Sequence, residues 1–191
     1  MADITADLVK QLRDATGAGF MDCKRALQET DGDVDKAVAL LRERGVAAAE
    51  KRSGREAREG LISSYIHTGG RVGVLIEVNC ETDFVARNED FQKLVRDLAI
   101  QVAGLAPQWV AREDVPDSAI QAKRAELEED PRTRADIDAH LERWLKEAVL
   151  LDQPFRDTNQ TVRDLVTNAI ATIGENIVVR RFTRYALGED L

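Results

Sequence analysis

The side chains best suited to covalent chemistry are few and widely spaced in this sequence. Its only imidazoles and thiols are those of His67, His140, Cys23 and Cys80. The histidines lack the His-Glu-x-x-His spacing of a zinc-binding helix, and neither cysteine has a histidine at a spacing that predicts a nucleophile with its base. We therefore expect structural or surface histidines and small buried thiols kept reduced, with no catalytic residue and no metal site.

Two glycine-containing stretches are candidates for binding a phosphate, and neither has the required spacing. "TGAG" at 16–19 and "GGRVG" at 69–73 match neither the P-loop nor the dinucleotide-binding fingerprint. Glycine also supplies the positive φ angles of tight turns, and we interpret both stretches as turns. The sequence therefore predicts no cofactor.

One short connection carries an aromatic side chain in an unusual place. In "NCETDFVARNEDF", residues 79–91, Phe84 follows a strand-like run and precedes a helix-like run. Connections usually lie on the surface and are polar. Phe84 either packs back as a hydrophobic staple, which the pattern alone slightly favours, or projects as an apolar anchor flanked by Asp83 and Arg87. Composition and periodicity leave both interpretations open.

Helices are predicted before this connection. Three short helices fit residues 4–44, with Asp33 as the N-cap of the third and Gly45 at its expected end. Residues 46–60 are rich in alanine and then in charges of both signs, which is typical of a solvated, partly helical linker. Three helices of this length form a very small bundle that is marginal alone.

A hairpin is predicted after the linker, with a strand from Leu61, a turn at 68–71 and a second strand from Val72. The helical period returns at Asn88, and a third strand follows the last helix. Strands separated by helices predict an α+β fold: a small three-helix amino-terminal domain, then a core in which a three-stranded antiparallel sheet packs against helices. The second strand has one apolar face that must be covered, formed by Val72, Val74, Ile76 and Val78.

The composition is that of an acidic chain with enough apolar residues for a core. Of 191 residues 43% are hydrophobic, and 35 acidic against 27 basic residues give a net charge of −8. An acidic excess repels phosphate backbones, so we expect no direct nucleic-acid partner. The first residues lack the features of a signal peptide, and no apolar run approaches the roughly 20 residues that span a bilayer. We expect a cytoplasmic protein without membrane contact.

Four motifs, in order along nearly the whole chain, resemble the elongation factor Ts family of bacterial type. They are "LRDATGAGFMDCKRAL" at 12–27, "EVNCETDFVARNEDF" at 77–91, "DQPF" at 152–155 and "IGENIVVRRF" at 173–182. Together they are specific. The resemblance implies a nucleotide exchange factor that binds elongation factor Tu in its GDP-bound and nucleotide-free states, without covalent catalysis or a cofactor.

The resemblance also implies a domain organisation and contact residues. It implies a three-helix head of ubiquitin-associated type at 1–45, a charged linker at 46–60 and an α+β core at 61–191. Phe84 is implied to insert into an apolar pocket between partner helices, which reverses the preference for a staple. The implied partner contacts are Thr82, Asp83, Phe84, Val85, Arg87 and Asn88 in the core, and Thr16, Gly17, Ala18, Gly19 and Met21 in the head.

The chain resembles the short, single-core members of this family, which pair as homodimers. It has one hairpin, one returning strand and no heptad run. We expect the apolar face of Val72, Val74, Ile76 and Val78 to serve that pairing. Some short members join the pair through a cysteine near the carboxyl terminus, and "RYALGEDL" has none, so the expected homodimer has no intersubunit disulfide.

Two other functions compete with nucleotide exchange. The head could bind a peptide or a ubiquitin-like protein without exchange activity, and Phe84 would then be irrelevant. A small-molecule enzyme would need a polar pocket and a nucleophile, and the scattered histidines and cysteines argue against it.

Overall fold

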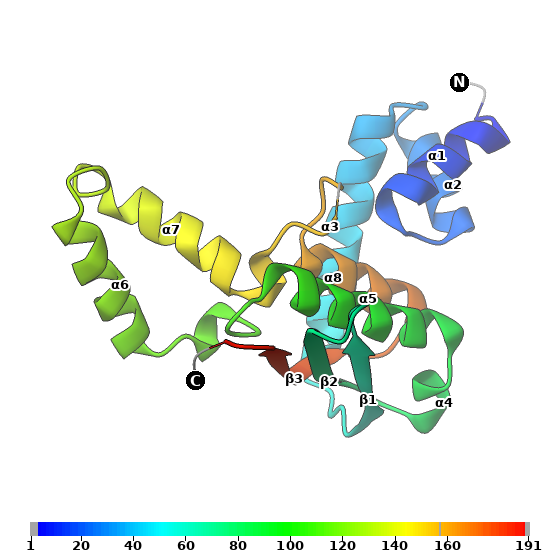
Figure 1. The fold of residues 1–191 in the computed structure, drawn as a ribbon. Helices are drawn as coiled ribbons and strands as arrows, with labels where there is room; N and C mark the ends of the chain where they lie inside the picture. Colours follow the sequence, from blue (N-terminus) through cyan, green and yellow to red (C-terminus); the bar gives the residue numbers. More distant parts are fainter. Residues whose placement is uncertain (1–3, 157, 190–191) are drawn as a thin grey trace. The chain divides into compact units, whose positions relative to one another are not determined.

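The computed structural model describes residues 4–156 and 158–189, in which helices and strands follow one another as in an α+β chain (Figure 1). Eight α-helices, two short 3-10 helices (η1 and η2) and three strands occur in this part of the chain, and the predicted fold class is confirmed. In chain order the elements are α1 (Ala6–Thr16), α2 (Phe20–Glu29), α3 (Val34–Ser53), β1 (Glu59–Ile66), β2 (Val72–Cys80), α4 (Asp83–Ala86), α5 (Glu89–Leu105), η1 (Arg112–Asp114), α6 (Asp117–Glu129), α7 (Ile137–Ala148), η2 (Leu150–Asp152), α8 (Val162–Ile173) and β3 (Val178–Ala186).

The chain divides into two units. The first takes the described residues up to Ile62 together with Glu77–Val95 and Arg163–Val179. The second takes Ser63–Ile76, Arg96–Val162 and the described residues from Arg180 onward. Each unit therefore combines segments that are far apart in the sequence.

The three strands form one antiparallel sheet in the order β1-β2-β3. β1 and β2 make the predicted hairpin, in which the amide of His67 donates to the carbonyl of Val72 at 2.9 Å. Gly69 and Gly70 adopt φ angles of +91° and +70°, a region that glycine enters without a steric cost. The turn between the strands therefore lies where the sequence predicts it.

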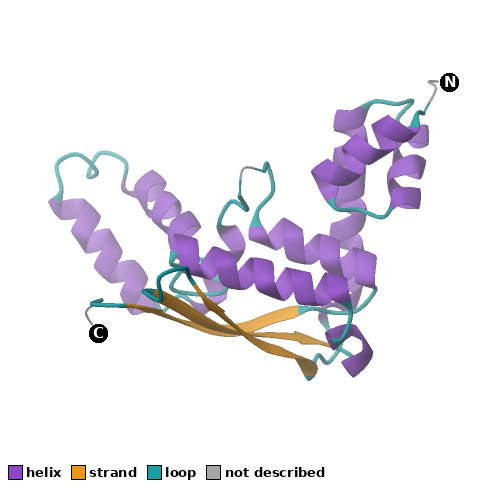
Figure 2. Ribbon diagram, turned by 45° about the vertical axis from the view of Figure 1, so that its right-hand side comes forward, coloured by secondary structure: helices purple, strands orange, loops and turns teal. Residues whose placement is uncertain are grey.

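One face of β2 is already covered within the chain. Val74, Ile76 and Val78 are buried and Val72 is half-buried, whereas Leu75 on the opposite face is exposed. In the first unit, α8 and the start of α5 lie over one face of the strands (Figures 1 and 2). The expectation that the Val72–Val78 face pairs with a second copy is therefore wrong, because three of its four side chains are already buried within the chain.

The three predicted amino-terminal helices pack around a small apolar core in the first unit. Leu12, Cys23 and Leu27 are fully buried there, and Ile4 and Leu8 pack against the cluster. Capping fixes where the helices begin. The carboxylate of Asp33 accepts from the amide of Lys36 at 3.0 Å, so the predicted N-cap of the third helix is confirmed.

The third helix, α3, does not end at Gly45 as expected but continues to Ser53. Gly45 is buried against α8: a Cβ there would lie 3.4 Å from Asn168 Oδ1, so a residue without a side chain allows the two helices to come close. The alanines that follow favour the continued helix. Much of the expected linker at 46–60 is therefore helical, and the division into head, linker and core stays a prediction.

In the second unit, α6 and α7 pack against each other. Trp109 meets Trp144 edge to face with ring centroids 5.6 Å apart. The guanidinium of Arg112 binds Glu142 at 2.9 Å and also contacts Asp152, and these hydrogen bonds raise its pKa further. Apolar packing and one shared arginine therefore hold this part of the unit together.

Candidate functional site

The connection that carries Phe84 folds as a single helical turn, α4, between the end of β2 and the start of α5 (Figure 1). Thr82 caps the turn, since its Oγ1 accepts from the amide of Val85 at 3.4 Å. Phe84 is 79% exposed. The staple interpretation is therefore wrong, and Phe84 projects into solvent.

An exposed phenyl ring alone identifies nothing, because isolated apolar side chains are common on protein surfaces. Leaving it in water forgoes roughly 1.5–3 kcal/mol of burial. The backbone beneath Phe84 is the more informative feature, since Ala86 is buried and Val85 is half-buried. The ring is therefore presented from a turn whose other apolar residues face inward.

Polar neighbours surround the ring. Asp83 and Arg87 form an ion pair at 2.8 Å one turn apart, in which the side chain of Arg87 is largely exposed and that of Asp83 is half-exposed. The side-chain oxygen of Asn88 accepts from the amide of Asp90 at 2.7 Å, which fixes the start of α5. The structure thus brings together the six predicted residues from Thr82 to Asn88, with one large apolar side chain among charged and capping groups.

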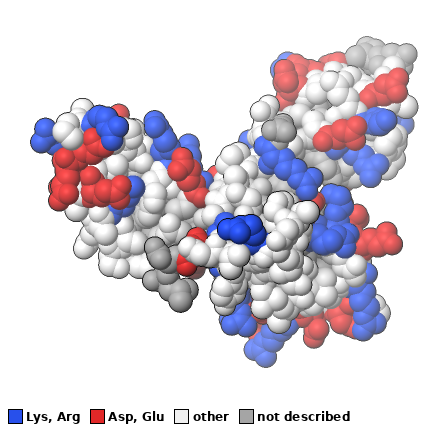
Figure 3. Space-filling view, viewed as in Figure 1, with Lys and Arg blue, Asp and Glu red and all other residues white. Residues whose placement is uncertain are grey.

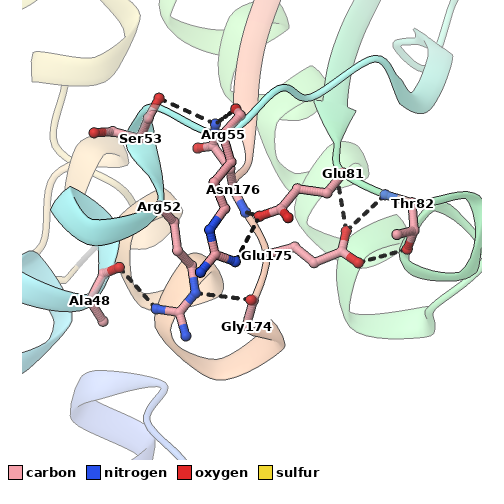
Figure 4. Close-up of polar contacts among 9 residues, drawn as sticks. All are labelled: Ala48, Arg52, Ser53, Arg55, Glu81, Thr82, Gly174, Glu175 and Asn176. Carbon is pink, nitrogen blue, oxygen red and sulfur yellow. Dashed lines mark hydrogen bonds and ion pairs between the residues drawn. The ribbon is translucent and has the colours of Figure 1, made fainter.

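A carboxylate from a distant part of the first unit reaches the start of α4. Glu175, between α8 and β3, accepts hydrogen bonds from the amides of Glu81 and Thr82, each at 3.0 Å. Its other oxygen accepts from the hydroxyl of Thr82 at 2.6 Å (Figure 4). Sequence reasoning assigned no role to Glu175, because 93 residues separate it from Thr82 and no local pattern links them.

The thiol of Cys80, just before α4, is buried and inert. It donates to the carbonyl of Thr82 at 3.2 Å. Burial, with a smaller contribution from the charge of Glu175, raises the pKa of Cys80 to about 11. Burial also raises the pKa of Cys23. Both thiols are therefore protonated near neutral pH, when thiolates are the reactive form.

The predicted head contacts form a turn between α1 and α2. The side chain of Thr16 is buried and donates to the carbonyl of Leu12 at 2.7 Å, so Thr16 shapes the turn instead of presenting a surface. Gly17, with φ of +70°, ends α1. Met21 is 62% exposed. Ala18 and Gly19 are half-buried between these residues.

Sequence reasoning missed Phe20, which is 48% exposed beside Met21 on the same turn. Its position in "TGAGFM", directly after the glycines of the turn and at the first residue of α2, is a signal that could have found it. The turn is also tied to α8, since the side chain of Asn168 donates to the carbonyl of Thr16 at 2.8 Å. The head turn therefore presents two neighbouring apolar side chains.

Charge is distributed without a dominant sign over the face in Figure 3, where acidic and basic side chains alternate. Within residues 4–156 and 158–189, no group of three or more His, Cys, Asp or Glu side chains is arranged to hold a metal ion. None of the helices in the described ranges combines the length and apolar character needed to cross a membrane.

An aromatic side chain held by a capped turn is suited to filling a pocket on a binding partner, as aromatic anchors do in many interfaces. Comparison with known proteins gives the family. The elongation factor TS family profile matches residues 29–167, more than half of the chain. The chain belongs to the elongation factor Ts family, and so to the factors of translation elongation.

Three relatives illustrate how far the similarity extends. The elongation factor Ts of Coprothermobacter proteolyticus is 54% identical over 98% of this chain and all of its own length. That of Synechococcus elongatus is 54% identical over the whole of this chain and 91% of its own length. That of Carboxydothermus hydrogenoformans is 50% identical over 98% of this chain and 91% of its own. The similarity therefore extends over essentially the full described fold.

Proposed function

We propose that this chain is a guanine nucleotide exchange factor that binds elongation factor Tu and releases its GDP. The observation that carries the proposal is the ring of Phe84, 79% exposed on a turn whose backbone is capped and hydrogen-bonded. Family membership supplies the partner. Phe84 inserts into an apolar pocket between helices of the partner's nucleotide-binding domain, flanked by the Asp83–Arg87 pair.

The exchange activity follows from coupling between two binding events and needs no covalent step in this chain. A guanine nucleotide is held by a phosphate-binding backbone loop and Mg²⁺, so shifting the helices that support that loop weakens its binding. The coupling is reciprocal, and GDP must weaken the binding of this chain by the same factor. The chain therefore binds the nucleotide-free partner most tightly, and incoming nucleotide displaces it.

The head turn forms a second contact with the same partner. Phe20 and Met21 offer exposed apolar area there, while Thr16, Gly17, Ala18 and Gly19 set the shape of the turn. Two separated contacts on one partner raise the affinity, because the second forms at a high effective concentration. Thr82, Val85 and Asn88 hold the geometry of the Phe84 contact.

A homodimer without an intersubunit disulfide is also proposed, through the face of the sheet opposite to the one first expected. In the second unit Ile66, Leu75, Tyr185 and Leu187 are exposed and line a shallow hollow of about 560 Å³. Contiguous exposed apolar side chains mark interaction surfaces. Leu75→Glu should convert a dimer into a monomer in concentration-dependent light scattering; a monomeric wild-type chain at every concentration would contradict the homodimer.

The direct test of the exchange proposal is the release of a fluorescent GDP analogue from elongation factor Tu, followed with and without the full chain. At a saturating concentration of this chain, the release of the GDP analogue should accelerate by at least an order of magnitude. Unchanged release with measurable binding would favour a binding module without exchange activity. Unchanged release without binding would reject elongation factor Tu as the partner.

A further inference from the structure

The helical turn that carries Phe84 lacks half of its own capping arrangement. In a complete capping box the N-cap hydroxyl accepts from the amide at position N3, and a Glu or Gln side chain at N3 accepts from the N-cap amide. Thr82 supplies the first half. Position N3 is Val85, whose side chain cannot accept a hydrogen bond. The acceptor for the N-cap amide must come from elsewhere.

Glu175 supplies that acceptor. Its Oε2 accepts from the N-cap amide of Thr82 and from the preceding amide of Glu81, each at 3.0 Å. Its Oε1 accepts from the Thr82 hydroxyl at 2.6 Å, which orients that hydroxyl so that its lone pairs face the amide of Val85. Three charge-assisted hydrogen bonds therefore converge on one half-buried carboxylate at the start of α4.

A helix of four residues has little stability of its own, because the first turn fixes several backbone angles for few hydrogen bonds. The orientation of α4, and with it the direction of the Phe84 ring, therefore depends on groups outside the turn.

The segment that holds Glu175 is itself fixed in the first unit, as Figure 4 shows. The guanidinium of Arg52, near the end of α3, donates to the carbonyl of Gly174 at 2.9 Å. The buried side chain of Asn176 donates to the carbonyl of Arg55 at 2.8 Å. The amide of Asn176 donates to the carboxylate of Glu81 at 2.6 Å. Glu81 and Glu175 thus bind each other's segments reciprocally.

We infer that Glu175 is a positioning residue for Phe84, which sets the direction of the ring through the start of α4 without touching the partner. The inference rests on the proposed exchange function for its effect on GDP release. Its effect on α4 in the free chain is independent of that function.

Substitutions at position 175 distinguish the effect of the hydrogen bonds of Glu175 from the effect of its side-chain volume. Glu175→Ala removes all three acceptors, and we expect at least a tenfold loss of accelerated GDP release with a nearly unchanged fold. Glu175→Gln keeps one carbonyl oxygen for the two amides, and we expect it to recover most of that loss. Glu142→Ala is the matched control, because it removes a carboxylate bound by Arg112 in the second unit. It should exchange like the wild type.

A double-mutant cycle tests whether Glu175 acts through Phe84. If it does, Glu175→Ala should add little to the loss already caused by Phe84→Ala, because there is no ring left to position. The inference would be overturned if the losses of the two single variants multiplied in the double variant. It would also be overturned if Glu175→Ala accelerated GDP release as well as the wild type does.

Amide hydrogen exchange of residues 82–88 in the free chain supplies the readout that does not depend on function. Glu175→Ala should speed exchange there at least tenfold, while amides in α1 and α2 stay unchanged. If the wild-type chain does not accelerate GDP release from elongation factor Tu, the proposed nucleotide-exchange function fails. The hydrogen-exchange measurement still decides whether Glu175 positions α4. Unchanged protection of 82–88 would overturn it.

Discussion

Two surface turns in the first unit each present an exposed phenylalanine, and they are stabilised in different ways. The head turn, residues 16–21, is closed by short-range bonds: the amide of Gly17 donates to Arg13, and the hydroxyl of Thr16 to Leu12. The α4 segment, residues 82–88, depends on Glu175 for the amide of its N-cap. One exposed phenylalanine is therefore held by a turn with short-range hydrogen bonds, and the other by a turn that needs a hydrogen bond from a distant residue.

The difference has consequences for both folding and function. A locally closed turn keeps its shape when one distant bond is removed, whereas the α4 segment should lose its orientation. The α4 segment also presents the more exposed ring, at 79% against 48% for Phe20. We therefore expect the proposed partner contact of α4 to be the stronger of the two and the more sensitive to substitutions far away in the sequence.

The largest expected effect contrasts Phe84 with Phe91, which is fully buried at the start of α5. Phe91→Ala should lower the free energy of unfolding by roughly 3–5 kcal/mol, because it leaves a cavity. Phe84→Ala should change it by less than about 0.5 kcal/mol, as is usual for surface substitutions. Urea denaturation followed by circular dichroism measures both. A large loss for Phe84→Ala would mean that the ring is part of the core after all.

The next prediction ranks the two exposed rings. Phe20→Ala should slow accelerated GDP release by about threefold to tenfold, or roughly 0.7–1.4 kcal/mol, and so by less than Phe84→Ala. Val46→Ala, which shortens another exposed apolar side chain of the first unit, serves as the control and should have no effect. A greater loss at Phe20 than at Phe84 would reverse the ranking.

A smaller effect tests the one long-range hydrogen bond described above for the head turn. Asn168→Ala removes the hydrogen bond to the carbonyl of Thr16 and should lower the free energy of unfolding by about 1 kcal/mol. GDP release should stay within about twofold of the wild type, because the short-range bonds of the turn remain. If Asn168→Ala impairs release as severely as Glu175→Ala, the proposed difference between the two turns does not exist.

The last prediction concerns the thiol of Cys80, whose pKa is raised in part by the charge of Glu175. The pKa of Cys80 is raised to about 11, above its ordinary value of 9.0, so the folded chain keeps it protonated at pH 8. Labelling by a thiol reagent at pH 8 should be at least tenfold slower than in denaturant. The unfolded thiol ionises first, so the free energy of unfolding should fall as pH rises from about 9 to 11. Rapid labelling of Cys80 in the native chain would contradict its burial.

Local signals made most of the architecture predictable. The glycines of the β1–β2 turn and the capping carboxylate of Asp33 each act within a few residues, and each is found where the sequence predicts it. The errors have a common physical cause in long-range packing. Gly45 lies inside α3 because α8 packs against it, and no property of its sequence neighbours reveals that contact.

The candidate site likewise has features that local sequence patterns predict and features that depend on long-range contacts. The position of Phe84 between a strand and a helix was visible in the sequence, but its exposure was not, because a staple and an anchor have the same pattern. Glu175 was part of a recognised motif and still received no role, since hydrogen bonds between segments 93 residues apart leave no local periodicity. The face of Val72, Val74, Ile76 and Val78 was expected to pair with a second copy and is instead buried within the chain. The sequence shows that this face is apolar but does not show what covers it.

The most direct test of the central claim is GDP release from elongation factor Tu measured side by side for the wild-type chain and Phe84→Ala, with a thermal melt of each. The account predicts accelerated release by the wild type, a loss of tenfold or more in Phe84→Ala, and nearly equal melting temperatures. Equal acceleration by the two proteins would show that the exposed ring is not the group that promotes release, and would contradict the account.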